Sequence, residues 1–129
     1  MGIFDSVFGK RKETDQQETR TPWIPLVSKD QLDGIEKKSR ERTQVIYKHS
    51  TTCGISSMVL RMFSSQYTFG EGVDHYFLDL HANRDVSNAV ETKFQVRHQS
   101  PQLLIVKDGK VSFHASHGAI VDINMKDYI

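Results

Sequence analysis

Strand-like and helix-like segments alternate along the chain from residue 23 onward, until two strand-like segments follow each other directly. β-Branched and other apolar residues form short runs over residues 23–26, 43–49, 74–80, 101–107 and 110–114. Helical spacing of apolar residues is expected over residues 28–39, 53–66 and 85–93, with a short last helix within 120–129. Alternation that ends in a hairpin indicates a mixed β-sheet with right-handed crossovers and helices on both faces. We therefore predict an α/β fold of this kind.

Local signals mark where these elements begin, turn and pack. Pro25 cannot donate a backbone hydrogen bond, so the first strand is expected at a sheet edge. Ser28 and Gln31 have the spacing of a capping box, which predicts a helix start. Asp108-Gly109 is the strongest hairpin turn signal in the chain. The buried face of the helix over 53–66 is predicted from apolar residues at helical spacing: Ile55, Met58, Val59, Met62 and Phe63.

The chain divides into an N-terminal segment and one domain. A length of 129 residues suits a single core. Residues 1–9 carry a narrow apolar stripe if helical, and residues 10–21 are charged and polar, as in a solvated linker. We predict that residues 1–21 form an amphipathic segment and linker that docks on its own domain or on a partner. Residues 22–129 are predicted to form the folded domain.

Charge, hydropathy and cysteine content exclude several classes of protein. Seventeen basic and sixteen acidic residues leave a net charge of +1, which favours neither nucleic acid nor a membrane surface. No apolar run approaches the roughly 20 residues of a membrane span, and the N-terminus lacks the pattern of a secretory signal. A single cysteine cannot form an internal disulfide. We therefore expect a protein of the reducing cytoplasm.

Cys53 is the candidate nucleophile because of where it stands. It follows a predicted strand and the loop Ser50-Thr51-Thr52, at the first turn of the next predicted helix. Unpaired N–H groups and the helix dipole at such a position stabilise a thiolate. Thr51, Thr52 and Ser56 place hydroxyl groups around the sulfur. A lone cysteine is more often buried and inert, but a loop rich in Ser and Thr favours the reactive interpretation.

Ser100-Pro101 and the histidines are the other candidate site residues. Pro101 begins a predicted strand at the same sheet end as Cys53, and an X–Pro bond can be cis. A cis bond there would expose the Ser100 backbone for pairing with a substrate segment, whereas an ordinary trans proline would have no such role. His49 and His117 could lie near the sulfur and help to hold a thiolate. The six histidines lack the spacing of a metal site, so no metal is predicted.

Three strings of this sequence are informative: KHSTTCGIS over residues 48–56, HQSPQ over 98–102 and SHGAI over 116–120. Together they resemble the bacilliredoxin family, the YtxJ-like monothiol proteins of the bacillithiol system. The resemblance extends from Trp23 to the C-terminus, and the order of predicted elements is that of thioredoxin. It implies a thioredoxin-like fold in which cis-Pro101 faces Cys53. The family's usual string is Thr-Cys-Pro-Ile-Ser, from which this chain departs at Gly54.

The resemblance also implies a reaction. Cys53 would remove bacillithiol, a small bacterial thiol, from mixed disulfides on proteins. Ser56 replaces the resolving cysteine of dithiol enzymes, and Tyr47 replaces the buried aspartate of thioredoxins, so an external thiol must regenerate Cys53. No tightly bound cofactor is expected, bacillithiol is the co-substrate, and bacillithiolated proteins are the partners. The residues implied to stabilise the thiolate or to position substrate are Thr52, Gly54, Ser56, Ser100, Pro101 and His117.

Two other functions remain open. Cys-Gly-Ile-Ser differs by one residue from the Cys-Gly-Phe-Ser string of monothiol glutaredoxins that carry iron–sulfur clusters with glutathione. The strand after Pro101 lacks their paired glycines, with only Gly118 nearby. The third interpretation is a non-catalytic thioredoxin-fold binding module, in which the cysteine is vestigial and the amphipathic N-terminus recruits a partner.

Overall fold

A computed structural model describes residues 23–67, 70 and 72–129, so the segment predicted over residues 1–21 lies outside the described residues. Within the described part, a mixed sheet has the strand order β1-β3-β2-β4-β5. The strands are β1 (Ile24–Pro25), β2 (Thr43–His49), β3 (Val73–Asp79), β4 (Gln102–Lys107) and β5 (Lys110–Ser116). The helices are α1 (Asp30–Lys38), α2 (Gly54–Gln66) and α3 (Arg84–Phe94), followed by the 3-10 helices η2 (His117–Asp122) and η3 (Met125–Asp127).

The strand pairing confirms the predicted mixed sheet. β1 and β2 both pair with β3 in parallel, whereas β4 pairs with β2 and β5 in antiparallel fashion. β1 lies at the edge, as Pro25 requires. Asp108 and Gly109 both have positive φ, 54° and 84°, which is the geometry of a tight hairpin turn.

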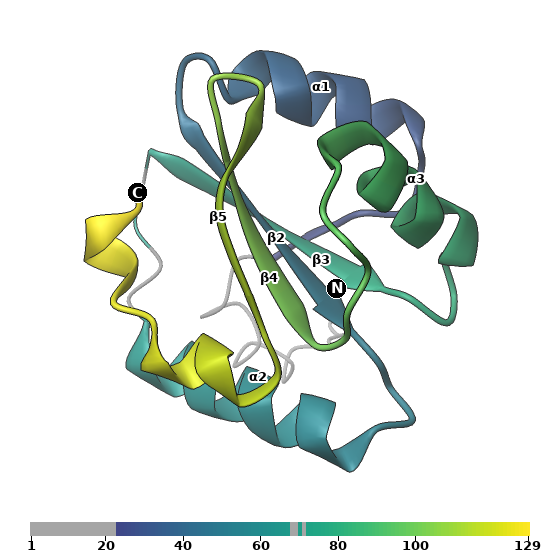
Figure 1. Ribbon diagram of the computed structural model, residues 1–129, viewed down its shortest axis with the longest axis vertical. Coiled ribbons are helices and arrows are strands. Elements are labelled where there is room, and N and C mark those ends of the chain that lie inside the picture. The colour runs from purple at the N-terminus through teal and green to yellow at the C-terminus, as the bar shows by residue number, and fades with distance from the viewer. Residues whose placement is uncertain (1–22, 68–69, 71) are drawn as a thin grey trace, which may run out of the picture.

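Helices cover both faces of the sheet, as Figure 1 shows, with α1 and α3 on one side and α2 on the other. One apolar core lies between the sheet and the pair α1 and α3, and includes Leu32, Ile46, Val90 and Leu104. The other lies between the sheet and α2 with η2, and includes Tyr47, Phe63 and Ile120. Side chains alternate along β2 and β4, so each strand contributes to both cores.

The start of α1 shows one of the two hydrogen bonds of the predicted capping box, the one from Ser28 to Gln31, with Lys29 at the N-cap. The Ser28 hydroxyl accepts a hydrogen bond from the Asp30 amide at 3.1 Å. The Gln31 side-chain oxygen accepts one from the Ser28 amide at 3.0 Å. The Asp30 amide belongs to the first turn, which has no helical partner for it, and the Ser28 amide lies just before the N-cap.

The prediction for the buried face of α2 was wrong for Ile55, Met58 and Met62. Their exposed fractions are 57%, 46% and 43%, whereas Val59 and Phe63 are buried. The apolar residues of this helix span a wider arc than the surface that the helix buries. The side that carries Ser56, Val59 and Phe63 is buried. The side that carries Ile55, Met58 and Met62 is left at the surface.

The C-terminal tail also differs from the predicted short helix within residues 120–129. β5 continues to Ser116, and two short 3-10 helices follow it. Ile120 and Met125 from these turns are buried against the α2 side of the sheet. No helix among the described residues is both long and apolar enough to cross a membrane.

Candidate active site around Cys53

Three loops meet at one end of the sheet. In the sheet register His49, at the end of β2, pairs with Asp79 at the end of β3. Lys48 pairs with Gln102, at the start of antiparallel β4. The loops that follow β2 and β3 and the loop that precedes β4 therefore emerge together. Cys53 stands in the first of these loops, and Pro101 ends the third.

Cys53 is a free, partly exposed cysteine at the N-cap of α2. Its backbone is extended, with φ −109° and ψ 119°. Its amide donates to the Ser50 carbonyl at 3.3 Å, and its carbonyl accepts from the Ser57 amide at 3.2 Å. Cys53 thus stands at the start of α2, where the amides of the first helical turn have no helical partner.

His81, in the loop after β3, holds the loop that carries Cys53. Its Nε2 lies 2.8 Å from the Ser50 hydroxyl and 3.0 Å from the Thr52 hydroxyl. These two hydroxyls are themselves 3.3 Å apart. The sequence alone assigned His81 no role in the site. The parallel pairing of β2 with β3 was the signal that could have placed residue 81 beside residues 50–52.

Ser56 is fully buried beneath this loop. Its Oγ accepts a hydrogen bond from the Ser50 amide at 3.1 Å and lies 2.9 Å from Nδ1 of His49. Burial lowers the pKa of His49, which nearby Asp79 partly opposes. A neutral His49 can accept a hydrogen bond from the Ser56 hydroxyl at Nδ1. Ser56 is thus part of a buried network, and His49 contacts it directly.

Ser100, Pro101 and His117 form the neighbouring side of the site. The Ser100–Pro101 bond is cis, as the resemblance implies. The Pro101 carbonyl accepts a hydrogen bond from the His117 amide at 2.9 Å. His117 itself is exposed and has φ 55°. The Ser100 hydroxyl is buried and makes no hydrogen bond among the described residues.

The predicted site residues thus fall into two groups at one end of the sheet. Thr52, Cys53, Gly54 and Ser56 belong to the α2 side, while Ser100, Pro101 and His117 belong to the β4–β5 side. Thr52 and Gly54 are exposed, and a Cβ at Gly54 would meet no atom within 4 Å. Besides His81, sequence reasoning missed the polar residues that hold the loop before Pro101.

Tyr47, six residues before Cys53 in the sequence, carries no charge. It is fully buried, and burial raises the pKa of its phenol, so the group is neutral over the physiological range. Its ring packs against Trp23, Phe63 and Phe77. The place that holds a buried aspartate in thioredoxins is therefore part of an aromatic core.

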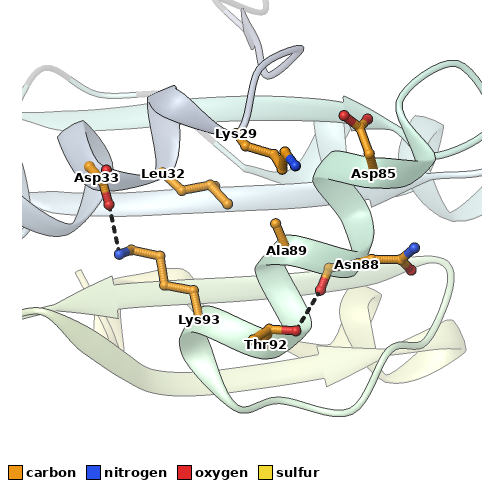
Figure 2. Close-up of a pocket in the computed structure, with 8 residues that line it drawn as sticks. All are labelled: Lys29, Leu32, Asp33, Asp85, Asn88, Ala89, Thr92 and Lys93. Carbon is orange, nitrogen blue, oxygen red and sulfur yellow. Dashed lines mark hydrogen bonds and ion pairs between the residues drawn. The ribbon is translucent and has the colours of Figure 1, made fainter.

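The two main pockets found among the described residues lie away from Cys53. The larger, of about 560 Å³, lies between α1 and α3, where Lys93 pairs with Asp33 at 2.9 Å (Figure 2). The other, of about 450 Å³, lies at the far end of α2 beside Phe63 and Met125. No group of three or more His, Cys, Asp or Glu side chains within the described residues could hold a metal ion.

Solved structures of other proteins share the fold of this chain. A candidate oxidoreductase with a thioredoxin fold matches with 30% identity and a TM-score of 0.66, over 77% of this chain and 87% of that one. Thioredoxin O2 from Arabidopsis thaliana matches with 24% identity and a TM-score of 0.60, over 85% and 97%. Thioredoxin from Malassezia sympodialis (Mala s 13) matches with 18% identity and a TM-score of 0.63, over 81% and 88%. These similarities establish the thioredoxin fold.

The family comparison is more specific than the fold. A profile described as monothiol bacilliredoxin BrxC matches residues 24–125, which include both groups of site residues. Together with the oxidoreductase neighbour, this match supports a thiol redox function. The match covers most of the chain, and the chain therefore belongs to the monothiol bacilliredoxin family.

Proposed function

We propose that this protein removes bacillithiol from protein mixed disulfides through Cys53. The observation that carries the proposal is a partly exposed cysteine at a helix start, the only cysteine of the chain. The position of a resolving cysteine holds buried, hydrogen-bonded Ser56. The chain therefore has one sulfur for exchange and needs a second molecule to complete a cycle.

The proposed reaction has two steps. The Cys53 thiolate attacks the bacillithiol sulfur of the mixed disulfide, and the target protein leaves as a thiolate that takes a proton from water. Cys53 is then disulfide-bonded to bacillithiol. A second small-thiol thiolate attacks that adduct, releases the Cys53 thiolate and leaves with bacillithiol as a disulfide. No tightly bound cofactor takes part, and bacillithiol is a co-substrate.

The surroundings of Cys53 suit this role. A helix start in general favours an anion such as a thiolate, and the proposed reaction uses Cys53 first as nucleophile and then as leaving group. Ser100 and Pro101, at the adjacent loop end, can present backbone to an extended target segment. A reduced Cys53 is needed for each cycle, so we place the reaction in a reducing compartment such as the cytoplasm.

The test uses the full chain and a peptide that carries a bacillithiol mixed disulfide. We expect mass spectrometry to detect a bacillithiol adduct on Cys53 together with free peptide thiol, and free bacillithiol to remove that adduct. Cys53→Ser should form no adduct while keeping the circular dichroism spectrum of the wild type. A matched peptide carrying glutathione tests which small thiol is preferred. The proposal fails if Cys53 forms no adduct with the bacillithiol peptide, whether or not it reacts with the glutathione peptide.

Alkylation and cluster reconstitution separate the other two functions. An exchange protein should react with iodoacetamide at Cys53 faster than a free cysteine peptide near neutral pH. Slow alkylation together with no adduct would favour a binding module. Brown, cluster-type absorbance after anaerobic reconstitution with iron, sulfide and glutathione would favour the glutaredoxin-like carrier.

A further inference from the structure

Lys48 is a fully buried lysine that the proposed exchange reaction does not use. It lies near the end of β2, five residues before Cys53. Gln102, its partner in the sheet register, is also buried. Fully buried lysines are rare because losing water around an ammonium group is costly. A lysine kept in this place needs a structural or functional reason.

The ammonium group of Lys48 contacts the loop before Pro101. Its Nζ lies 3.1 Å from Nδ1 of His98, and the Ser87 hydroxyl lies 3.3 Å from the same nitrogen. An ammonium group can only donate. Nδ1 of His98 must then be the acceptor, which leaves the ring neutral with its proton on Nε2.

Electrostatics agree with this assignment. Burial lowers the pKa of Lys48 to about 8, and Glu91 opposes the shift. Burial also lowers the pKa of His98, and Lys48 adds to that effect, while Glu91 opposes it. Arg84 further lowers the pKa of His98. At neutral pH the lysine is therefore mostly charged and the histidine mostly neutral.

Buried or partly buried side chains hold three consecutive residues of this loop. The His98 amide donates to the Glu91 carboxylate at 3.2 Å. The Gln102 side chain donates to the Arg97 carbonyl at 3.0 Å and accepts from the Gln99 amide at 3.4 Å. Lys48 alone among these groups reaches the loop from β2, the strand that leads to Cys53. It thus links the Cys53 side of the site to the Pro101 side.

We propose that Lys48 is a positioning residue, which, through its hydrogen bond to His98, fixes the loop that presents Ser100 and Pro101 to a target segment. The proposal rests on the proposed exchange function. This role requires no contact of Lys48 with the sulfur or with the substrate. It acts by keeping residues 97–100 in one conformation, so that a target backbone binds without first ordering the loop.

The test compares Lys48→Met, which keeps an unbranched side chain as far as Cε but removes the ammonium donor, with the wild type. We expect exchange with a peptide mixed disulfide to slow on the order of tenfold, since small misplacements at a reactive site are costly. Iodoacetamide does not bind the loop that presents Ser100 and Pro101, so the rate of Cys53 alkylation should change by less than about twofold. Amide hydrogen exchange of His98 and Gln99 should speed up on the order of tenfold as the loop opens.

Variants of His98 identify the hydrogen bond itself. His98→Ala should reproduce the effects of Lys48→Met, and the double variant should lose no more than either single one. His98→Asn keeps an acceptor near the place of Nδ1 and should recover most of the exchange rate. These variants also serve if Lys48→Met does not fold. An additive double variant, or an equal loss in His98→Asn and His98→Ala, would contradict the proposal.

Gln44→Met is the matched control. Gln44 lies on the same strand and face, is equally buried and bonds Asp74 at 2.7 Å, but stands near the opposite end of β2. The Gln44→Met variant should be less stable than the wild type, but its amide exchange at His98 and Gln99 should be no faster. Unchanged amide exchange in Lys48→Met would overturn the positioning role. If wild-type protein shows no disulfide exchange, the proposed function fails, while the amide measurement still decides the role of Lys48.

Discussion

The Ser56 hydroxyl lies 2.9 Å from Nδ1 of the buried His49. The same oxygen accepts a hydrogen bond from the Ser50 amide. At this helix position, a Cys-X-X-Cys protein carries its second sulfur. Here the side chain instead ties the end of β2 to the loop that carries Cys53, so Ser56 contributes to the structure around a single thiol.

Ser56→Ala should destabilise the protein. It leaves the Ser50 amide and Nδ1 of His49 without this partner in a buried place, at a cost of about 1–3 kcal/mol. Urea denaturation measures the change in the free energy of unfolding. Ser57→Ala, at the next and exposed residue, is the control and should change stability by less than about 0.5 kcal/mol. Equal effects of the two variants would mean that the buried network contributes nothing.

Adjacent residues near the end of α2 should respond very differently to truncation. Phe63 is 3% exposed and packs against Trp23, Tyr47 and Tyr67. Phe63→Ala should therefore cost about 3–5 kcal/mol. Met62 is 43% exposed, so Met62→Ala should change stability by less than about 0.5 kcal/mol. Thermal denaturation of both variants checks which half of the apolar arc is buried, and a large loss in Met62→Ala would contradict this packing.

Gly54→Pro should stabilise the fold. Gly54 is the first residue of α2, where proline is favoured because its missing N–H has no helical partner. The extended backbone of Cys53, φ −109° and ψ 119°, is the conformation that a following proline requires. With no atom within 4 Å of an added Cβ, we expect a gain of about 0.4–1 kcal/mol from a less flexible unfolded chain.

Denaturant titration measures this gain, and Gly54→Ala is the control that adds a Cβ without the ring. A loss of stability in Gly54→Pro that Gly54→Ala does not share would show that the ring, not the added carbon, fails to fit. Alkylation of Cys53 in both variants then tests whether the substitution alters the thiol as well as the fold.

Stability should fall as the pH drops from about 6.5 toward 4. Burial lowers the pKa of His75 from 6.5 to about 4. Between these values the unfolded chain binds a proton at this site and the folded protein does not, so protonation favours unfolding. The contribution of neutral His75 to the free energy of unfolding is fully present above pH 6.5. It is lost as the pH falls through the pKa of the folded state, and the total loss is up to about 3 kcal/mol. Burial also lowers the pKa values of His49 and His98, so these two residues contribute to the pH dependence with the same sign.

Urea denaturation at several pH values measures this slope. His75→Gln should reduce the slope between pH 6.5 and 4 even if it also lowers stability at neutral pH, because Tyr67 bonds His75 at 2.7 Å. His114→Gln alters an exposed residue and should leave the slope as in the wild type. The assignment to His75 is wrong if the two variants have the same slope.

The element order could be predicted because each element has a local signal. Pro25, the Ser28–Gln31 pair and the Asp108-Gly109 turn all lie where their short-range chemistry placed them. The family resemblance extended this to the fold, which the thioredoxin neighbours confirm. Helix phase was harder. A wide apolar arc on α2 does not reveal which half meets the sheet, and so Ile55, Met58 and Met62 were misplaced.

The candidate site was predictable only in part. Cys53 stands out because a strand, a polar loop and a helix start are adjacent in the sequence. The contacts of His81 and Lys48 join residues 29–50 positions apart, and no local pattern reports such pairs. They exist because parallel β2 and β3, and antiparallel β4, end together at one side of the sheet.

The sequence by itself thus determined the elements, their order, the family resemblance and the single thiol, since these follow from local periodicity, turn chemistry and motif. Only the tertiary structure decided that Ser56 is buried against His49, that His81 bonds the loop of Cys53, and that Lys48 reaches the loop before Pro101. Those arrangements depend on strand register and on the cost of burying polar groups without partners. Both are properties of the packed chain, not of any segment within it.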